Sequence, residues 1–244
     1  MLQTTPPDRA DHVGSLLRPP RLLAAREQHA AGRISADQLR AVEDDAIAEV
    51  VAMQEDVGLQ SAPDGECRRG SWHLDDIYQL GGVSRGQEQL KVRFRNQDGT
   101  IEFLSAALRI DGKIRLRHTI FGDDFTALQG LVRRATPKLT IPSPSMVHYR
   151  GGPAAIDHDV YPDIEEFWSD LSAAYAEQVR RLGELGCTYL QFDDTSLAYL
   201  NDPEQRAEIA RRGDDAELLH ELYVRQINNV LAGRPDGMSV TTHM

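Results

Sequence analysis

Two adjacent carboxylates, Asp193 and Asp194, directly follow the stretch Gly186–Phe192, which is rich in aliphatic, aromatic and β-branched residues. A short run of this kind after a helix-ending glycine predicts a buried parallel strand. Ligands of α/β proteins bind at the carboxyl ends of parallel strands, so both carboxylates are expected where chemistry takes place. The structural alternative is that Asp194 caps the next helix and that Asp193 accepts a hydrogen bond from a loop amide.

Polar residues also follow the other predicted strands. Each has a structural alternative. Ser15 could hydrogen-bond within a turn, Glu66 could pair with Arg68 or Arg69, and Tyr149 could simply cover the mouth of the barrel. Their recurrence favours one shared site, because carboxylates brought together need cations, amines or a metal to offset their repulsion. The candidates are His12, Gly14, Ser15, Asp64, Glu66, His118, Ser143, Ser145, His148, Tyr149, Asp193, Asp194 and His243.

The elements that would position these residues alternate between strand and helix. Polar residues at successive strand ends and right-handed crossovers favour an α/β fold of the TIM (β/α)8 barrel type, with about six of eight strand–helix units in one domain, residues 1–244. The alternating residues around 89–118 predict an inserted β-hairpin. Because closure needs eight strands, an open doubly wound sheet is the alternative. The expected strands are residues 10–15, 59–66, 114–118, 138–145, 186–192 and 238–243.

The composition is that of a globular chain, with 41% hydrophobic and 27% charged residues among 244. The net charge of −11 and the pI near 5.2 argue against a surface for nucleic acid or for anionic membranes. We expect neither a signal peptide nor a membrane span. Cys67 and Cys187 match no paired pattern, which favours a reducing compartment, and a cytoplasmic enzyme is the default expectation.

Taken together, five segments resemble the cobalamin-independent methionine synthase family, and more narrowly its short, single-barrel members. Those members are similar to the catalytic C-terminal half of the full-length enzyme. The resemblance runs from about residue 10 to the last residue, in the family's order and spacing. The segments are His12–Pro19, Asp64–Arg69, Pro142–Tyr149, Gln191–Asp194 and Thr242–Met244.

The resemblance implies a zinc-dependent methyltransferase of methionine biosynthesis that moves a methyl group from methyltetrahydrofolate to the thiol of homocysteine. Zinc coordination lets a thiol react as a thiolate. Gly14 and Ser15 would hold the amino acid, and Glu66 and Asp193 would bind its amino group. Tyr149 stands where the family has a tryptophan that stacks on the pterin.

The remaining implied roles are folate binding for Ser145 and zinc binding for His243. The chain departs from the family at Asp194, which replaces a glutamate, and at Thr195, which replaces a proline. The family's other zinc ligands and its acid–base histidine fall beyond Met244, so no catalytic residue is assigned. A zinc site needs three or four ligands.

We therefore expect a chain that is truncated after its sixth strand and inactive alone, and a second chain that supplies the missing strands is one expected partner. The other expected partners are small-molecule substrates. Two alternatives stay open. One is a related zinc-dependent alkyl transfer to another thiol, such as coenzyme M, and the other is a non-catalytic remnant or binding module.

Overall fold

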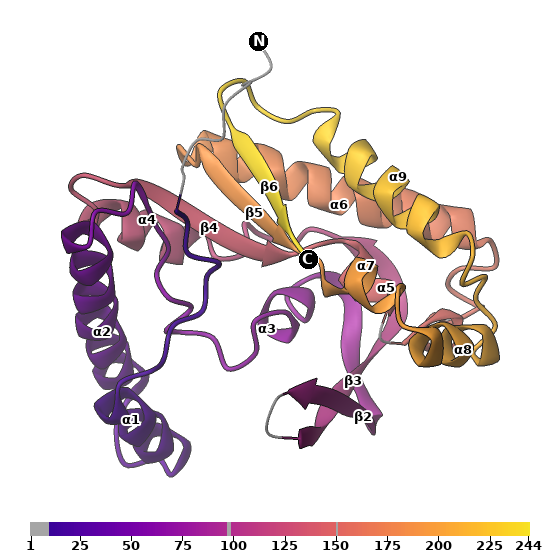
Figure 1. Ribbon diagram of the computed structural model, residues 1–244, viewed down its shortest axis with the longest axis horizontal. Helices are drawn as coiled ribbons and strands as arrows, with labels where there is room; N and C mark the ends of the chain where they lie inside the picture. Colours follow the sequence, from indigo (N-terminus) through magenta and orange to yellow (C-terminus); the bar gives the residue numbers. More distant parts are fainter. Residues whose placement is uncertain (1–9, 97–98, 150) are drawn as a thin grey trace.

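The computed structural model describes residues 10–96, 99–149 and 151–244. Within these ranges the fold is mixed α/β, built on a parallel sheet (Figure 1). No described helix is both long and apolar enough to cross a membrane.

The parallel sheet contains four strands in the order β1 (Ser61–Ala62), β4 (Thr136–Pro142), β5 (Tyr189–Asp193) and β6 (Ser239–His243). Every residue of β5 is buried, whereas most of β6 is half-buried because it forms an edge of the sheet. Pro142 pairs with Asp193, and Asp193 pairs with His243. The last three strands therefore end level with one another, which places their terminal side chains together.

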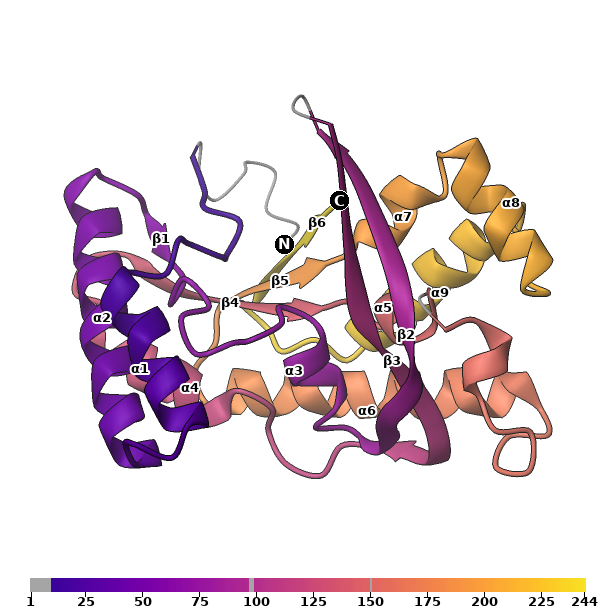
Figure 2. The same cartoon turned by 90° about the horizontal axis from the view of Figure 1, so that it is seen from below.

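One face of the sheet is covered by two long helices, α6 (Ile164–Glu184) and α9 (Leu219–Leu231), which pack against each other (Figures 1 and 2). The helix α6 is capped by Asp163, whose carboxylate accepts a hydrogen bond from the amide of Glu165. Its apolar stripe is buried in the main core, as the spacing of residues 167–182 predicts. Members of that core include Phe167, Leu171, Val179, Leu190, Phe192 and Tyr223.

A second helical group lies beside β1 and β4 and consists of α1 (Pro20–Ala30), α2 (Ala36–Asp56) and α4 (Gly122–Leu131). The longest helix of this group, α2, begins directly after Ser35. A capping box between Ser35 and Gln38 starts it, and Gly58, which has a φ of +88°, follows its end. These helices enclose a separate small core around Leu22, Ile47 and Leu128.

Short helices follow the strand ends on the carboxyl side of the sheet. They are α3 (Leu74–Ile77) after β1, α5 (Ser145–Tyr149) after β4, and α7 (Thr195–Tyr199) and α8 (Pro203–Arg211) after β5. A 3-10 turn at Pro153–Ala155 follows α5. Most of the candidate site residues therefore lie at the strand ends or in the short segments that directly follow them.

The hairpin is longer than the sequence predicts and forms its own two-stranded antiparallel sheet, β2 (Gly81–Asn96) with β3 (Gly99–Arg115), which projects as a long ribbon in Figure 2. The prediction of a third barrel strand at residues 114–118 is wrong. Ile114 and Arg115 end β3, and Arg115 pairs with Gly81. Alternation of polar and apolar residues identifies a strand but not its partner, which explains the error.

The expected first strand, residues 10–15, is also not a strand. The segment instead lies over the sheet and is held by side chains. The Lys138 ammonium donates to Asp11 Oδ2 and to the His12 carbonyl, both at 2.6 Å, and the Gln191 amide donates to the Val13 carbonyl at 2.8 Å. The expected second strand shortens to Ser61–Ala62. The described residues thus form four of six expected parallel strands, and they do not close into a barrel.

Candidate functional site

Asp193 and His243 end neighbouring strands and lie side by side. His243 Nδ1 is 3.5 Å from Asp193 Oδ1, and the same oxygen accepts a hydrogen bond from the Gln191 amide at 2.6 Å. Asp193 is buried, whereas the His243 ring is 40% exposed. The sequence prediction that these two side chains share one end of the sheet is confirmed.

Glu66 follows β1 in a strained turn, with a φ of 54° that side chains rarely adopt. The carboxylate of Asp64 stabilises this turn by accepting the Glu66 amide at 2.8 Å. Glu66 Oε1 accepts a hydrogen bond from the Thr140 hydroxyl at 2.9 Å and lies 3.4 Å from Arg69 Nη1. Glu66 Oε2 is buried and has no hydrogen-bond partner among the described residues.

The segment that carries Gly14 and Ser15 closes over Glu66. A Cβ atom on Gly14 would lie 3.0 Å from Glu66 Oε1 and 3.1 Å from Thr140 Cγ2, so a larger residue here would have to displace these side chains by a few tenths of an ångström. The Arg18 guanidinium joins the two loops, because it donates to Ser15 Oγ at 2.6 Å and to the Glu66 carbonyl at 2.8 Å.

A cavity of about 250 Å³ lies between these elements. One part of its wall is polar, and the remainder is apolar or aromatic. The polar side chains are Ser15, Glu66, Asp193, Thr195 and His243, and the others are Val13, Trp72 and Tyr199. Of the candidate residues, this cavity brings together Ser15, Glu66, Asp193 and His243, whereas Tyr149 does not line it.

Two curated relatives from Bacillus subtilis (strain 168) are similar over nearly the whole chain. The uncharacterized protein YxjH is 37% identical over 243 residues, and the uncharacterized protein YxjG is 36% identical over 240 residues. Each match covers 98% or more of this chain but 62% of the relative, so the chain spans about three fifths of their length. No protein-family model matches the chain.

Two solved structures are similar in fold, and one of them is also similar in sequence. A Listeria monocytogenes protein, provisionally identified as a vitamin-B12-independent methionine synthase, is 36% identical, with a TM-score of 0.78 over 96% of this chain and 64% of that one. The chain resembles the cobalamin-independent methionine synthase family. A B12-independent methionine synthase from Shewanella sp. W3-18-1, in complex with selenomethionine, supports the fold at 16% identity, a TM-score of 0.62 and coverage of 87% of this chain and 54% of that one.

The two adjacent carboxylates of this methionine-synthase-like chain have different surroundings. Asp194 is fully buried and caps α7 by accepting the Ser196 amide at 3.0 Å. Its other oxygen accepts hydrogen bonds from Ser143 and Ser145, each at 2.6 Å. The structural alternative therefore holds for Asp194, and Asp193 is the carboxylate that reaches the cavity. The Ser145 hydroxyl is buried and already donates to Asp194.

Three candidate histidines lie outside the cavity lining. His12 accepts the Gly14 amide at 3.2 Å, and His118 lies 2.9 Å from Gln79 on the surface. His148 is buried, where desolvation lowers its pKa to about 3, and its Nδ1 is 3.0 Å from the Tyr223 hydroxyl. A neutral, enclosed imidazole of this kind stabilises the packing of α5 against α9.

Sequence reasoning did not identify Trp72 or Tyr199 as cavity residues. Both follow segments that were singled out, Trp72 six residues after Glu66 and Tyr199 six residues after Asp193. Aromatic residues just beyond a strand end are the signal that would have found them, because short helices and turns after strands fold back over the sheet's carboxyl edge.

The described residues do not by themselves form a complete zinc site. They contain no group of three or more histidine, cysteine or acidic side chains placed to hold a metal ion. His243 has one acidic neighbour, Asp193, and a zinc site needs three or four ligands. The role of His243 as a zinc ligand therefore stays a prediction, and no chemical step is derived through a metal.

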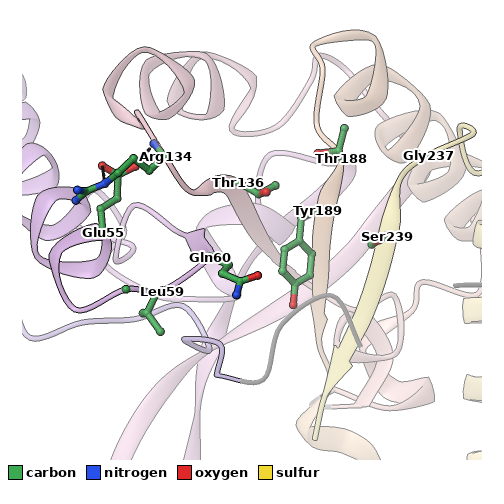
Figure 3. A pocket seen from close by; sticks show the side chains of 10 residues that line it. Glu55, Leu59, Gln60, Arg134, Thr136, Thr188, Tyr189, Gly237 and Ser239 are labelled. Carbon is green, nitrogen blue, oxygen red and sulfur yellow. Dashed lines mark hydrogen bonds and ion pairs between the residues drawn. The ribbon is translucent and has the colours of Figure 1, made fainter. Parts of the chain in front are cut away.

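A larger cavity, of about 660 Å³, lies at the opposite end of the strands (Figure 3). Its acidic residue, Glu55, already has partners. Glu55 Oε1 accepts the amides of residues 133, 134 and 135, and these hydrogen bonds lower the pKa of Glu55 to about 2. Glu55 thus stabilises the turn before β4, and the smaller cavity is the candidate site.

Burial, aided by the nearby Glu66 carboxylate and opposed by the Gln191 hydrogen bond, raises the pKa of Asp193 from 3.8 to about 6. The folded state then binds more protons than the unfolded state between these values, so this group's contribution to stability is present below pH 4 and is lost as the pH rises through 6. We expect Asp193→Asn to increase the free energy of unfolding at pH 7.5 by roughly 2 kcal/mol. Urea unfolding at pH 4 and pH 7.5 measures this, and the gain should vanish at the lower pH.

The matched control for this experiment is Asp236→Asn, at an exposed turn position. It should change stability little at either pH. If Asp193→Asn and the unaltered chain have the same free energy of unfolding at pH 7.5, the charge of Asp193 does not destabilise the folded state.

Proposed function

We propose that this chain holds the amino-acid site of a methyltransferase that transfers a methyl group to the thiol of homocysteine. Glu66 and Asp193 would bind the ammonium group, and Ser15, held against Glu66 by Arg18 and by the close approach of Gly14, would contact the rest of the amino acid. The proposal rests on one observation above all, the buried and unpartnered Glu66 Oε2 at a cavity that also contains Asp193. A buried carboxylate oxygen without a partner is costly, and a ligand ammonium would supply the missing donor.

The same observation favours homocysteine over a thiol without an amine, such as coenzyme M. Two acidic groups repel an anionic sulfonate and attract an ammonium. We propose that the methyl donor is methyltetrahydrofolate. We also propose that the protein is cytoplasmic and that its sheet closes into a barrel. Zinc, with His243 as one ligand, belongs to the same proposal, for a protein that includes the part of the relatives' length outside this chain.

Calorimetry with the 244-residue chain tests the amino-acid site. We expect L-homocysteine and L-methionine to bind at least tenfold more tightly than 4-(methylthio)butanoate, the methionine analogue without the amine, because a hydrogen bond to a charged group contributes about 1.5–3 kcal/mol. Affinity should also fall as the pH drops from 7.5 to 5.5, because Asp193 takes up a proton near pH 6.

Coenzyme M is the comparison ligand in the same titration. Binding of coenzyme M equal to that of homocysteine would replace this proposal with transfer to another thiol. Equal binding of methionine and its analogue without the amine would show that the carboxylates do not recognise an ammonium group.

A further inference from the structure

The aromatic residue assigned to the methyl donor by family resemblance, Tyr149, is enclosed in the structure. The residue is 4% exposed, and its hydroxyl donates to Gln205 Oε1 of α8 at 3.2 Å. One ring face is covered by Tyr199, because the two rings are nearly parallel at 9°, with centroids 5.5 Å apart. A ligand cannot stack on that face while Tyr199 occupies it.

Tyr199 is placed to contact a ligand. It ends α7 and lines the cavity together with Glu66 and Asp193. The helix is fixed at its start by Asp194, which caps it and is bound in turn by the Ser143 and Ser145 hydroxyls. This attachment at the start of α7 and the stacked Tyr149 ring together hold Tyr199 half-buried at the cavity wall.

We propose that Tyr199, and not Tyr149, presents the aromatic face on which the planar ring of the methyl donor stacks. Tyr149 is then a positioning residue that acts through the Tyr199 ring. The inference rests on the proposed function, because it assumes a pterin-type donor. The aromatic part of the cavity wall, which also includes Trp72, favours a flat ligand beside the acidic pair, since parallel rings attract one another when offset.

The two assignments predict effects of opposite sign for Tyr199→Ala. If Tyr199 is the stacking face, its removal weakens binding of 5-methyltetrahydrofolate by about tenfold or more, as loss of one stacked ring does elsewhere. If Tyr149 is the stacking face and Tyr199 covers it, the same substitution uncovers Tyr149 and strengthens binding. Calorimetry with the full chain and 5-methyltetrahydrofolate as the probe measures the difference.

Three further variants complete the experiment. Tyr199→Phe keeps the ring and should bind within about twofold of the unaltered chain. Leu197→Ala alters the same helix at a residue that does not line the cavity, and it should leave binding unchanged. Tyr149→Ala should weaken donor binding while Tyr149→Phe restores it, which a merely structural loss of the Gln205 hydrogen bond would not produce.

Binding of L-homocysteine distinguishes failure of the stacking role of Tyr199 from failure of the proposed function. Weaker donor binding by Tyr199→Ala, with homocysteine binding retained, supports the inference. Unchanged or tighter donor binding by that variant overturns the inference and leaves the proposed function in place. If the unaltered chain binds homocysteine but not 5-methyltetrahydrofolate, both the stacking role and the proposed donor are wrong.

Discussion

Replacing Glu66 with glutamine is expected to weaken L-homocysteine binding by roughly 100-fold and to leave the chain folded. Glu66 Oε2 is a buried oxygen that lacks a hydrogen-bond partner among the described residues, and a ligand ammonium placed there would form a charge-assisted hydrogen bond. Such bonds contribute about 1.5–3 kcal/mol, and an ammonium left facing an amide group loses the ion pair as well. Calorimetry at pH 7.5 measures the affinity.

Folding should survive this substitution because the neighbouring contacts remain possible. A glutamine oxygen in place of Glu66 Oε1 still accepts the Thr140 hydroxyl, which is 2.9 Å away. Glu184→Gln is the matched control, since Glu184 lies exposed at the end of α6 and contacts Arg180. Homocysteine binding that is the same in Glu66→Gln and in the control would remove the central support for an amino-acid site.

The position of the candidate site follows from the sequence because strand ends carry polar residues in chain order. The burial of β5 and its register with β4 and β6 place Asp193 beside His243, as the apolar run before Asp193 predicts. The apolar run alone does not tell Asp193 from Asp194, and only the family resemblance assigned the ammonium group to Asp193. The difference arises from Ser143 and Ser145, which lie about 50 residues away in the chain and bind Asp194.

Two expected strands were wrong for a related reason. The alternating pattern of residues 114–118 fits any half-buried strand. Arg115 pairs with Gly81, which lies in a region with no apolar alternation of its own. Residues 10–15 lie where a first strand is expected, but side chains of Lys138 and Gln191 take the place of a neighbouring backbone. Long-range partners of this kind cannot be read from local periodicity.

The contact between Lys138 and Asp11 is expected to be a major source of stability for the segment that carries Ser15. The Lys138 side chain is fully buried, and its ammonium donates to Asp11 Oδ2 at 2.6 Å. Asp11 also accepts hydrogen bonds from Tyr189 and Ser61. Replacing Asp11 with alanine leaves a buried ammonium with the His12 carbonyl but no counter-charge. Removal of one partner of a buried ion pair costs about 3–5 kcal/mol, and we expect a loss near the lower value.

Urea unfolding of Asp11→Ala, Lys138→Met and the double variant measures this coupling. Lys138→Met alone should cost less, because the Asp11 side chain is 24% exposed and can be solvated. The double variant should recover most of the stability lost in Asp11→Ala, since it removes the unpaired charge. Homocysteine affinity should fall in Asp11→Ala even where the chain is folded, because residues 11–15 would no longer be held over the sheet. Additive losses in the double variant would mean that the two side chains act independently, and that the position of Ser15 depends on other contacts, such as the Arg18 hydrogen bonds.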